Sequence, residues 1–199
     1  GCDYNKGAPK LTLNEIMEGL SLQLNSYLLA LSKTKSTKDL LPAAMMYIYL
    51  HGRPKSISVP PNGIPHAKEK ENTNGIFLND PDVLRTLDSQ SGTDDGFIGV
   101  SYVKDGSVKK TSPVLTAEEF EALKALTEKI LIRLYSRLES GEIAIHPVKN
   151  GTLSPCSYCP YRSICRFDPA LPENSFDYIS KVSDKTIREK LDEEMKRTG

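Results

Sequence analysis

Residues 12–32, Thr12-Leu-Asn-Glu-Ile-Met-Glu-Gly-Leu-Ser-Leu-Gln-Leu-Asn-Ser-Tyr-Leu-Leu-Ala-Leu-Ser32, and residues 43–50, Ala43-Ala-Met-Met-Tyr-Ile-Tyr-Leu50, decide the fold class. In the first stretch apolar side chains recur with a helical period, and Thr12 and Glu15 have the spacing of a capping box. The second stretch is a short apolar run rich in aromatic and branched residues, which is typical of a buried strand. A helix followed by a buried strand predicts an α/β fold.

A second strong helix is predicted further along the chain. Thr116 and Glu119 again have capping-box spacing, apolar side chains then recur at helical spacing as far as Leu138, and Gly141 is a suitable stop. Before this helix, residues 97–103 and 107–111 flank a Lys-Asp-Gly turn. That arrangement predicts a β-hairpin or a pair of edge strands.

Composition narrows the function classes. The 199 residues include 26 Lys and Arg against 26 Asp and Glu, so any contact with DNA needs a local patch or a partner chain. The hydrophobic share of 38% is enough to bury a core. The longest apolar stretches fall short of the ~20 residues of a membrane span, and no N-terminal signal precedes them. We therefore expect a cytoplasmic protein without a membrane span.

The cysteines are unevenly distributed. Three of them form the array Cys156-Ser-Tyr-Cys159-Pro-Tyr-Arg-Ser-Ile-Cys165, while Cys2 stands alone at the other end. In a cytosolic chain such crowding favours a metal site over a disulfide, and the prolines favour a turn that lets thiolates converge. Four thiolates make a zinc or a [4Fe-4S] site, so the array is one ligand short.

A second constellation lies near the N-terminus. Asp3-Tyr4-Asn5 reads as the end of a strand, and Gln23 and Tyr27 follow at positions i and i+4 of the first predicted helix. Residues at that spacing share a helix face, so an amide and a hydroxyl lie side by side within reach of a strand-end carboxylate or a bound phosphate. The alternative is structural: a surface Asp, a capping Gln and a Tyr at the edge of the core.

Three blocks of the chain resemble a known family. They are Asp3-Tyr4-Asn5 with Gly19-Leu-Ser-Leu-Gln23-Leu-Asn-Ser-Tyr27, the stretch Gly75-Ile-Phe-Leu-Asn-Asp-Pro-Asp-Val-Leu84, and the cysteine array with Arg166-Phe-Asp168. In this order they resemble the nuclease domain of the AddB subunit of bacterial AddAB helicase-nucleases, a RecB-like branch of the PD-(D/E)xK superfamily. The resemblance implies a partial restriction-endonuclease-like core followed by an iron-sulfur segment.

The resemblance also implies a mechanism and site residues. Members hydrolyse DNA phosphodiesters with Mg2+ held by acidic side chains and a backbone carbonyl. By position, Asp3 matches the metal-binding acid, Tyr4 supplies the adjacent carbonyl, and Asn5 stands at the catalytic lysine position. Gln23 and Tyr27 match the helix motif that supports the site and the DNA.

Two departures from the family pattern affect activity. Asn5 is a neutral amide where the family has lysine, and strand alternation points Lys6 to the opposite face unless a bulge intervenes. The upstream acidic ligand of the family is also absent from this chain. We therefore expect the 199-residue chain to have little or no nuclease activity by itself.

The same resemblance assigns the cysteines to a [4Fe-4S] cluster. Cys156, Cys159 and Cys165 would be three of its ligands, and the fourth would be a cysteine far upstream, outside this chain. Cys2 does not match that position and is interpreted as a small apolar strand residue. Zinc remains open as an alternative, with His146 or Cys2 completing the site. The neighbouring Arg162 and Arg166 suit DNA phosphates, or ion pairs with Asp168 or Glu173.

Taken together, these features predict two parts. Residues 1–145 would be the C-terminal part of a RecB-like nuclease domain, with an insertion around residues 52–115. Residues 146–199 would hold the iron-sulfur segment and a charged amphipathic tail, either solvated or docked on a partner subunit. The implied role is exonucleolytic processing of DNA ends for recombinational repair with an ATP-dependent AddA-type helicase-nuclease partner. The alternative is a non-catalytic module that clamps DNA.

Overall fold

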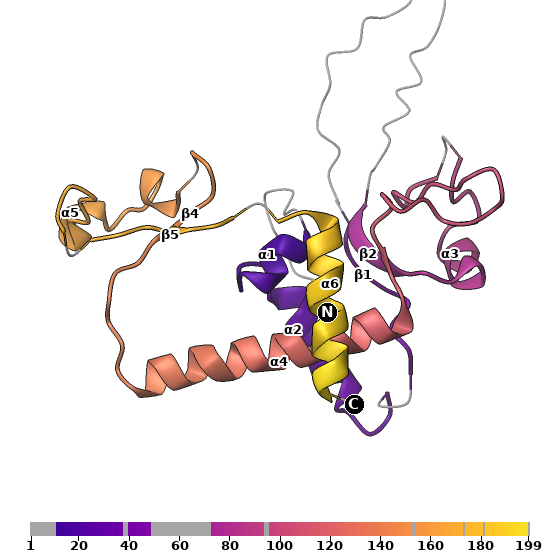
Figure 1. The fold of residues 1–199 in the computed structure, drawn as a ribbon, viewed down its shortest axis with the longest axis horizontal. Helices are drawn as coiled ribbons and strands as arrows, with labels where there is room; N and C mark the ends of the chain where they lie inside the picture. The colour runs from indigo at the N-terminus through magenta and orange to yellow at the C-terminus, as the bar shows by residue number, and fades with distance from the viewer. Residues whose placement is uncertain are drawn as a thin grey trace, which may run out of the picture.

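The computed structural model describes residues 11–37, 40–48, 73–93, 96–152, 154–172, 174–180 and 182–198 (Figure 1). In these ranges the chain forms short and long helices, a three-stranded sheet and a separate two-stranded sheet. In chain order the elements are α1 (Leu13–Met17), α2 (Gln23–Ser32), β1 (Ala44–Tyr47), β2 (Asn74–Leu78), α3 (Pro81–Leu87), β3 (Val114–Leu115), α4 (Ala117–Glu139), β4 (Val148–Lys149), the 3-10 helix η1 (Pro155–Ser157), α5 (Arg162–Cys165), β5 (Asp177–Tyr178) and α6 (Asp184–Thr198). The predicted α/β class is confirmed.

The three-stranded sheet has the order β1-β2-β3, with β2 in the centre. Strand β2 runs antiparallel to β1 and parallel to β3, so that Phe77 lies opposite Ala44 on one side and Val114 on the other. Residues 74–115 belong to the predicted insertion, yet they supply the central strand and β3. Part of the predicted insertion therefore contributes strands to this sheet, and the division of the chain into domains stays a prediction.

Side chains of β2 alternate between two hydrophobic clusters, as the two-residue period of a strand requires. Ile76 and Leu78 point into the larger cluster, which is built with residues of α1, α4 and α6. Phe77 points to the opposite face, where it packs with Leu84 of α3 and Ile98. The sheet thus lies between a layer of helices and a smaller layer of α3 and its following loop.

The predicted helix over residues 12–32 is in fact two helices. Thr12 caps α1 as expected, accepting a hydrogen bond from the Glu15 backbone N–H at 3.2 Å. The chain then reverses at Gly19, whose φ of 78° suits glycine, and the Leu20 N–H donates to the Glu15 carbonyl at 2.8 Å. The apolar spacing alone concealed this break, because both helices turn apolar side chains to the same core.

Helix α4 agrees with the sequence pattern at both ends. Thr116 and Glu119 form the full capping box: the side chain of each accepts from the backbone N–H of the other. At the other end Ser140 caps the helix and Gly141 follows with φ of 70°. Phe120, Ala122 and Leu123 of this helix are buried in the larger cluster.

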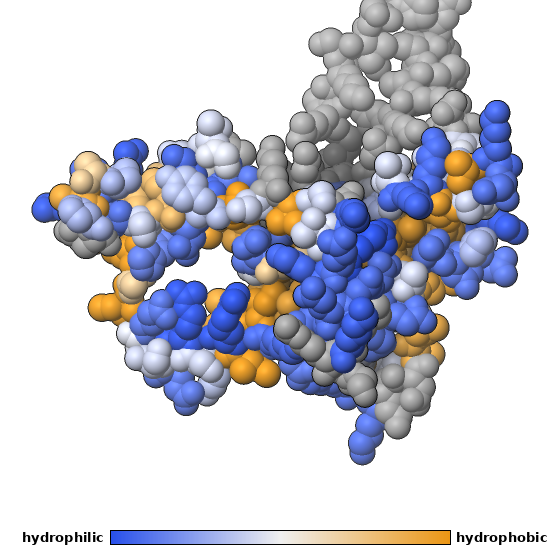
Figure 2. Space-filling view, viewed as in Figure 1, coloured by the Kyte–Doolittle hydropathy of each residue, from blue (hydrophilic) through white to orange (hydrophobic). Residues whose placement is uncertain are grey.

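The amphipathic tail forms α6 and docks on its own chain. Figure 1 shows α6 crossing α4, and Ile187 and Leu191 are buried in the larger cluster. The Arg188 guanidinium donates to the Glu119 carboxylate at 2.5 Å and to the Val114 carbonyl at 3.0 Å. Figure 2 shows that the outward side over α6 is hydrophilic. The tail therefore packs with the sheet and α4 rather than standing alone in solvent.

The predicted hairpin is present in short form, as an antiparallel bridge between Tyr102 and Val108 closed by a turn at Gly106.

No helix within the described ranges combines the length and the apolar character that crossing a membrane requires.

Candidate functional site

Helix α2 brings the two helix-motif residues together. Gln23 and Tyr27 lie one turn apart, and the Gln23 amide donates to the Tyr27 hydroxyl at 3.4 Å. Gln23 is half-buried and Tyr27 is 41% exposed, so the pair lies at the surface of the helix layer. This is the side-by-side placement that the i, i+4 spacing predicts.

The opposite face of α2 carries a polar residue that the sequence analysis did not single out. Asn25 is 1% exposed, and its side-chain amide donates to the Ser21 carbonyl at 3.1 Å. Its carbonyl oxygen has no hydrogen-bond partner in the described part of the chain. Among the described residues the amide of this side chain is paired but its oxygen is not, so the unpaired buried oxygen costs free energy in this packing of α2.

The other members of the predicted catalytic set, Asp3, Tyr4 and Asn5, lie outside the described residues. Cys2 lies there too. The roles of Asp3, Tyr4 and Asn5 at a magnesium site, and of Gln23 and Tyr27 beside it, stay predictions.

The two ends of the cysteine segment pair with each other, and this pairing forms the base of the segment. Strands β4 and β5 pair in parallel, which joins Val148 to Asp177 and Lys149 to Tyr178. Above this pairing the rings of Phe167 and Phe176 meet edge to face with centroids 4.8 Å apart. The Lys149 ammonium lies 4.9 Å from the centre of the Phe176 ring, a cation-π distance.

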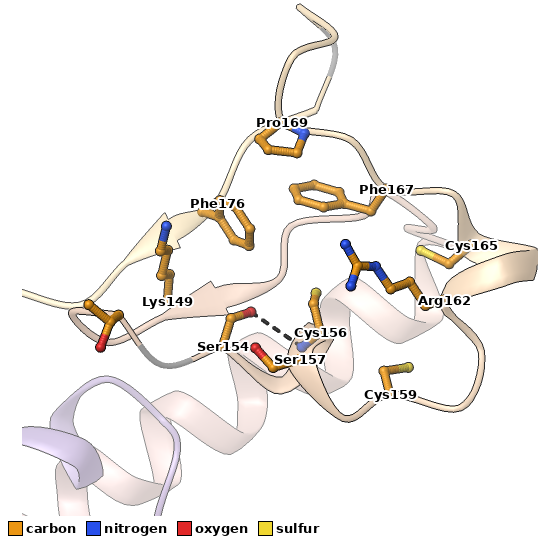
Figure 3. Close-up of a pocket in the computed structure, with 11 residues that line it drawn as sticks. Lys149, Ser154, Cys156, Ser157, Cys159, Arg162, Cys165, Phe167, Pro169 and Phe176 are labelled. Atoms are coloured by element: carbon orange, nitrogen blue, oxygen red, sulfur yellow. Dashed lines mark hydrogen bonds between the residues drawn. The ribbon is translucent and has the colours of Figure 1, made fainter.

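The three clustered cysteines line one pocket of about 300 Å³ at this base (Figure 3). Cys156 lies on η1, which Ser154 caps by accepting from the Cys156 N–H at 3.3 Å. Cys159 follows in the connecting turn, and Cys165 ends α5. The remaining lining consists of hydroxyl-bearing, aromatic and basic residues together with a proline: Lys149, Thr152, Ser154, Ser157, Arg162, Phe167, Pro169 and Phe176.

The chemistry of this pocket fits a thiolate-held metal centre. Among the described residues that line it, three sulfur donors lie with two cations and with no carboxylate or imidazole. Ser154 is the only buried residue in the described part of residues 142–180, so this segment has no buried apolar side chain of its own. Small segments without a core generally need a metal or a disulfide to hold one structure.

In the described structure the side chains of this pocket are not arranged as a complete site for a single metal ion. Among the described residues, no group of three or more His, Cys, Asp and Glu side chains is placed to hold a metal ion. His146, one proposed completing ligand for zinc, does not line the pocket, and its Nδ1 lies 3.1 Å from the Ser175 hydroxyl instead. The identity of the centre stays a prediction.

The two arginines of the segment occupy different places. Arg162, the first residue of α5, lines the pocket, and Figure 3 shows its side chain extending among the cysteines. Arg166 follows α5 in a left-handed conformation with φ of 52° and is not part of the lining. Neither arginine forms an ion pair with Asp168, whose carboxylate instead accepts from the Ala170 N–H at 2.9 Å.

The connection from α4 to the cysteine segment begins with an ion pair whose two groups have shifted pKa values. Arg137 forms a two-point ion pair with Glu142, with its Nε donating at 2.8 Å. This hydrogen bond lowers the pKa of Glu142 below its usual value and raises that of Arg137. Both groups are exposed, so the pair orients the start of the connection without strongly stabilising it.

Nearly the whole chain is similar to known proteins. The B-type subunit of the ATP-dependent helicase/deoxyribonuclease of Desulforamulus reducens is 32% identical over 192 residues, which is 93% of this chain and 16% of that protein. The corresponding proteins of Clostridium kluyveri and Bacillus licheniformis are 33% and 32% identical over 93% and 99% of the chain, and the matches span 17% and 18% of those proteins. The chain therefore spans about a sixth of the length of these curated relatives.

The family comparison covers both the predicted catalytic residues and the cysteine array. The model of the PD-(D/E)XK nuclease superfamily matches residues 2–166, from Cys2 to the residue after Cys165. This is well over half of the 199 residues. The chain belongs to the PD-(D/E)XK nuclease superfamily.

Proposed function

We propose that the chain is a nuclease-domain fragment of a bacterial helicase/deoxyribonuclease B-type subunit, which hydrolyses DNA phosphodiesters with Mg2+ at DNA ends during recombinational repair. The observation that carries this proposal is the hydrogen-bonded pair Gln23 and Tyr27 on one face of α2. These two residues match the helix motif that the resemblance implies, and the family match of the chain also covers Asp3. Relatives bearing the helicase/deoxyribonuclease name support the same assignment.

The proposed chemistry divides between the ion and the chain. A bound Mg2+ supplies Lewis-acid chemistry, which activates water and offsets charge on the attacked phosphate. Asp3 and the Tyr4 carbonyl would hold the ion. Gln23 would donate its amide hydrogens toward the site or the DNA, while the Tyr27 hydroxyl, already accepting from Gln23, holds that amide in place.

The cysteines would hold a [4Fe-4S] cluster that staples the segment. Cys156, Cys159 and Cys165 line one pocket, and we place the fourth cysteine ligand elsewhere in the longer polypeptide. The lack of buried apolar side chains in the described part of this segment supports such a staple, since little else there resists unfolding. A pocket of about 300 Å³ also offers more room than a single zinc ion needs.

The protein would act in the cytoplasm with an ATP-dependent AddA-type partner, and the chain by itself would have little or no activity. Asn5 cannot supply the positive charge that the family's lysine places near the attacked phosphate, and such electrostatic groups contribute about 10²–10³-fold to rate. Magnesium-dependent cleavage of linear DNA by the 199-residue chain, lost on Asp3→Ala, would contradict this expectation.

Replacing Asn5 by lysine in the full-length protein tests the proposal. If the site is intact apart from the lysine, Asn5→Lys should raise Mg2+-dependent cleavage of end-labelled linear DNA by about 10²-fold. The matched control is Asp3→Ala combined with Asn5→Lys, which adds the same lysine but removes the ion ligand. Cleavage by this control sets the background from any other nuclease in the preparation.

The alternative function is a non-catalytic module that clamps DNA. It is favoured by the neutral side chain at position 5. Asn5→Lys would then leave cleavage at the background level, while binding of linear DNA in a gel-shift assay would persist. That outcome would contradict the nuclease proposal and support the clamp.

A further inference from the structure

The pocket of the cysteine segment is unusual in its charges. The described residues of its lining include three thiols and two cations, Lys149 and Arg162, but no acidic side chain. Three metal-bound thiolates carry a negative charge that doubly charged iron or zinc only partly offsets. A pocket that collects cations and excludes acids is therefore complementary to a thiolate-held centre.

The two cations are not equivalent. Lys149 lies over aromatic rings, 4.9 Å from the centre of Phe176 and 5.8 Å from that of Tyr178, so its charge is directed to their faces. Arg162 forms no ion pair with any acidic side chain of the described residues, although Asp168 is close in sequence. Arg162 is also exposed, so no buried partner is needed to compensate its charge.

Helix α5 sets the position of Arg162. It is the first residue of α5, the short helix that ends at Cys165, and it lies three residues after Cys159. Figure 3 shows the guanidinium in the space among Cys156, Cys165 and Phe167. A guanidinium keeps its charge at all physiological pH values and offers five N–H donors in a planar fork.

We propose that Arg162 is a positioning residue for the cysteine-held centre, whose guanidinium offsets the charge of the thiolate ligands and donates N–H groups to their sulfur atoms. The inference rests on the proposed function, because it requires that these cysteines hold a metal centre. Hydrogen bonds to sulfur and nearby positive charge stabilise the reduced form of an iron-sulfur cluster. Arg162 thereby raises the reduction potential of the centre and slows its loss.

The chain offers a matched control in Arg166. It lies four residues further on, in the same segment, but outside the pocket lining. Arg166→Gln and Arg162→Gln therefore remove the same charge from the same segment, one beside the thiols and one away from them. Arg162→Lys keeps the charge but loses the planar fork of donors.

The test uses the full-length protein purified anaerobically with its metal in place. Iron and sulfide content establish the centre, and two readouts follow: the rate at which a chelator removes the metal, and the midpoint potential. Arg162→Gln should lose metal about 10-fold faster than the unmodified protein and should have a lower midpoint potential. Arg162→Lys should fall between the two, and Arg166→Gln should match the unmodified protein.

The outcomes separate this inference from the cofactor proposal. If Arg162→Gln and Arg166→Gln lose metal at equal rates and have equal midpoint potentials, the proposed role of Arg162 is overturned. This holds if both variants differ from the unmodified protein, and also if neither does. Zinc without iron would overturn the cluster assignment, while zinc-release rates of the same variants would still decide on Arg162. Unmodified protein that holds neither metal would overturn the cofactor proposal and this inference with it.

Discussion

The sheet with its helix layer and the cysteine segment differ in what holds them together. The sheet and the layers on its two faces contain all the buried large apolar side chains of the described residues, including Phe77, Phe120 and Leu123. The cysteine segment is stabilised by a two-residue strand pairing, an aromatic contact and a cation over a ring, and its only buried residue in the described ranges is Ser154. The same chain thus builds one part by hydrophobic burial and another part almost without it.

This difference indicates how each part depends on its surroundings. A hydrophobic core removes apolar area from water and is stable in proportion to that area. A segment without such burial must obtain its free energy from few contacts, and a metal centre bound by three thiols is the strongest source that its side chains offer. The two parts should therefore respond differently to the same perturbation.

The largest effect is expected from a cavity in the larger hydrophobic cluster. Phe120 is fully buried on α4, and Phe120→Ala should lower the free energy of unfolding by about 3–5 kcal/mol. Denaturant unfolding followed by circular dichroism measures this change. The comparison variant is Tyr161→Ala in the cysteine segment: Tyr161 is 67% exposed, and a loss of more than about 0.5 kcal/mol there would contradict the absence of burial.

Removing the proposed metal should instead destabilise the cysteine segment and leave the sheet and its helices unchanged. The Ile179 N–H donates to the Lys149 carbonyl at 3.0 Å and the Asp177 N–H to the Pro147 carbonyl at 3.1 Å, and both bonds close the base of the cysteine segment. After chelation these two amides should exchange with solvent about 10-fold to 10²-fold faster, while amides in the middle of α4 keep their rates. Hydrogen exchange followed by mass spectrometry distinguishes the two parts. Unchanged exchange at Ile179 would show that the segment is held without metal.

A smaller effect sharpens the assignment of α6 to the core. Arg188 joins α6 to the Glu119 carboxylate and the Val114 carbonyl, and the Glu119 side chain is 9% exposed. Arg188→Met keeps the length of the side chain but leaves that carboxylate without its cation, so the free energy of unfolding should fall by about 1–3 kcal/mol. Lys185→Met is the control on the same helix, since Lys185 pairs with exposed Glu189 and should change stability little. Equal effects of the two variants would mean that α6 is not anchored through Arg188.

Sequence patterns predicted the local features well where the cause is local. The capping box of Thr116 and Glu119 and the stop at Gly141 depend on residues a few positions apart, and both are present. The contact of Gln23 with Tyr27 follows from helix spacing in the same way. The break at Gly19 also has a local cause, since glycine readily adopts the positive φ that ends a helix, but the continuous apolar period concealed it.

The features that the sequence did not reveal depend on residues far apart in the chain. Nothing near Asn74–Leu78 indicates that this strand becomes the centre of the sheet, because its two neighbours lie about 30 and 40 positions away. Arg162 was predicted to meet DNA phosphates or carboxylates, and only the folded segment places it in the pocket with the cysteines.

The sequence by itself determined α4 with both its ends, the N-cap of α1, the α/β class, the superfamily motifs and the cysteine array, since periodicity, capping and motif spacing act over short distances. Tertiary structure alone decided that α6 docks on α4, that β2 is central, and that the ends of the cysteine segment pair to form a base. The ion pair of Arg188 with Glu119 spans 69 positions. Such contacts are selected by the burial of whole faces, which local sequence does not encode.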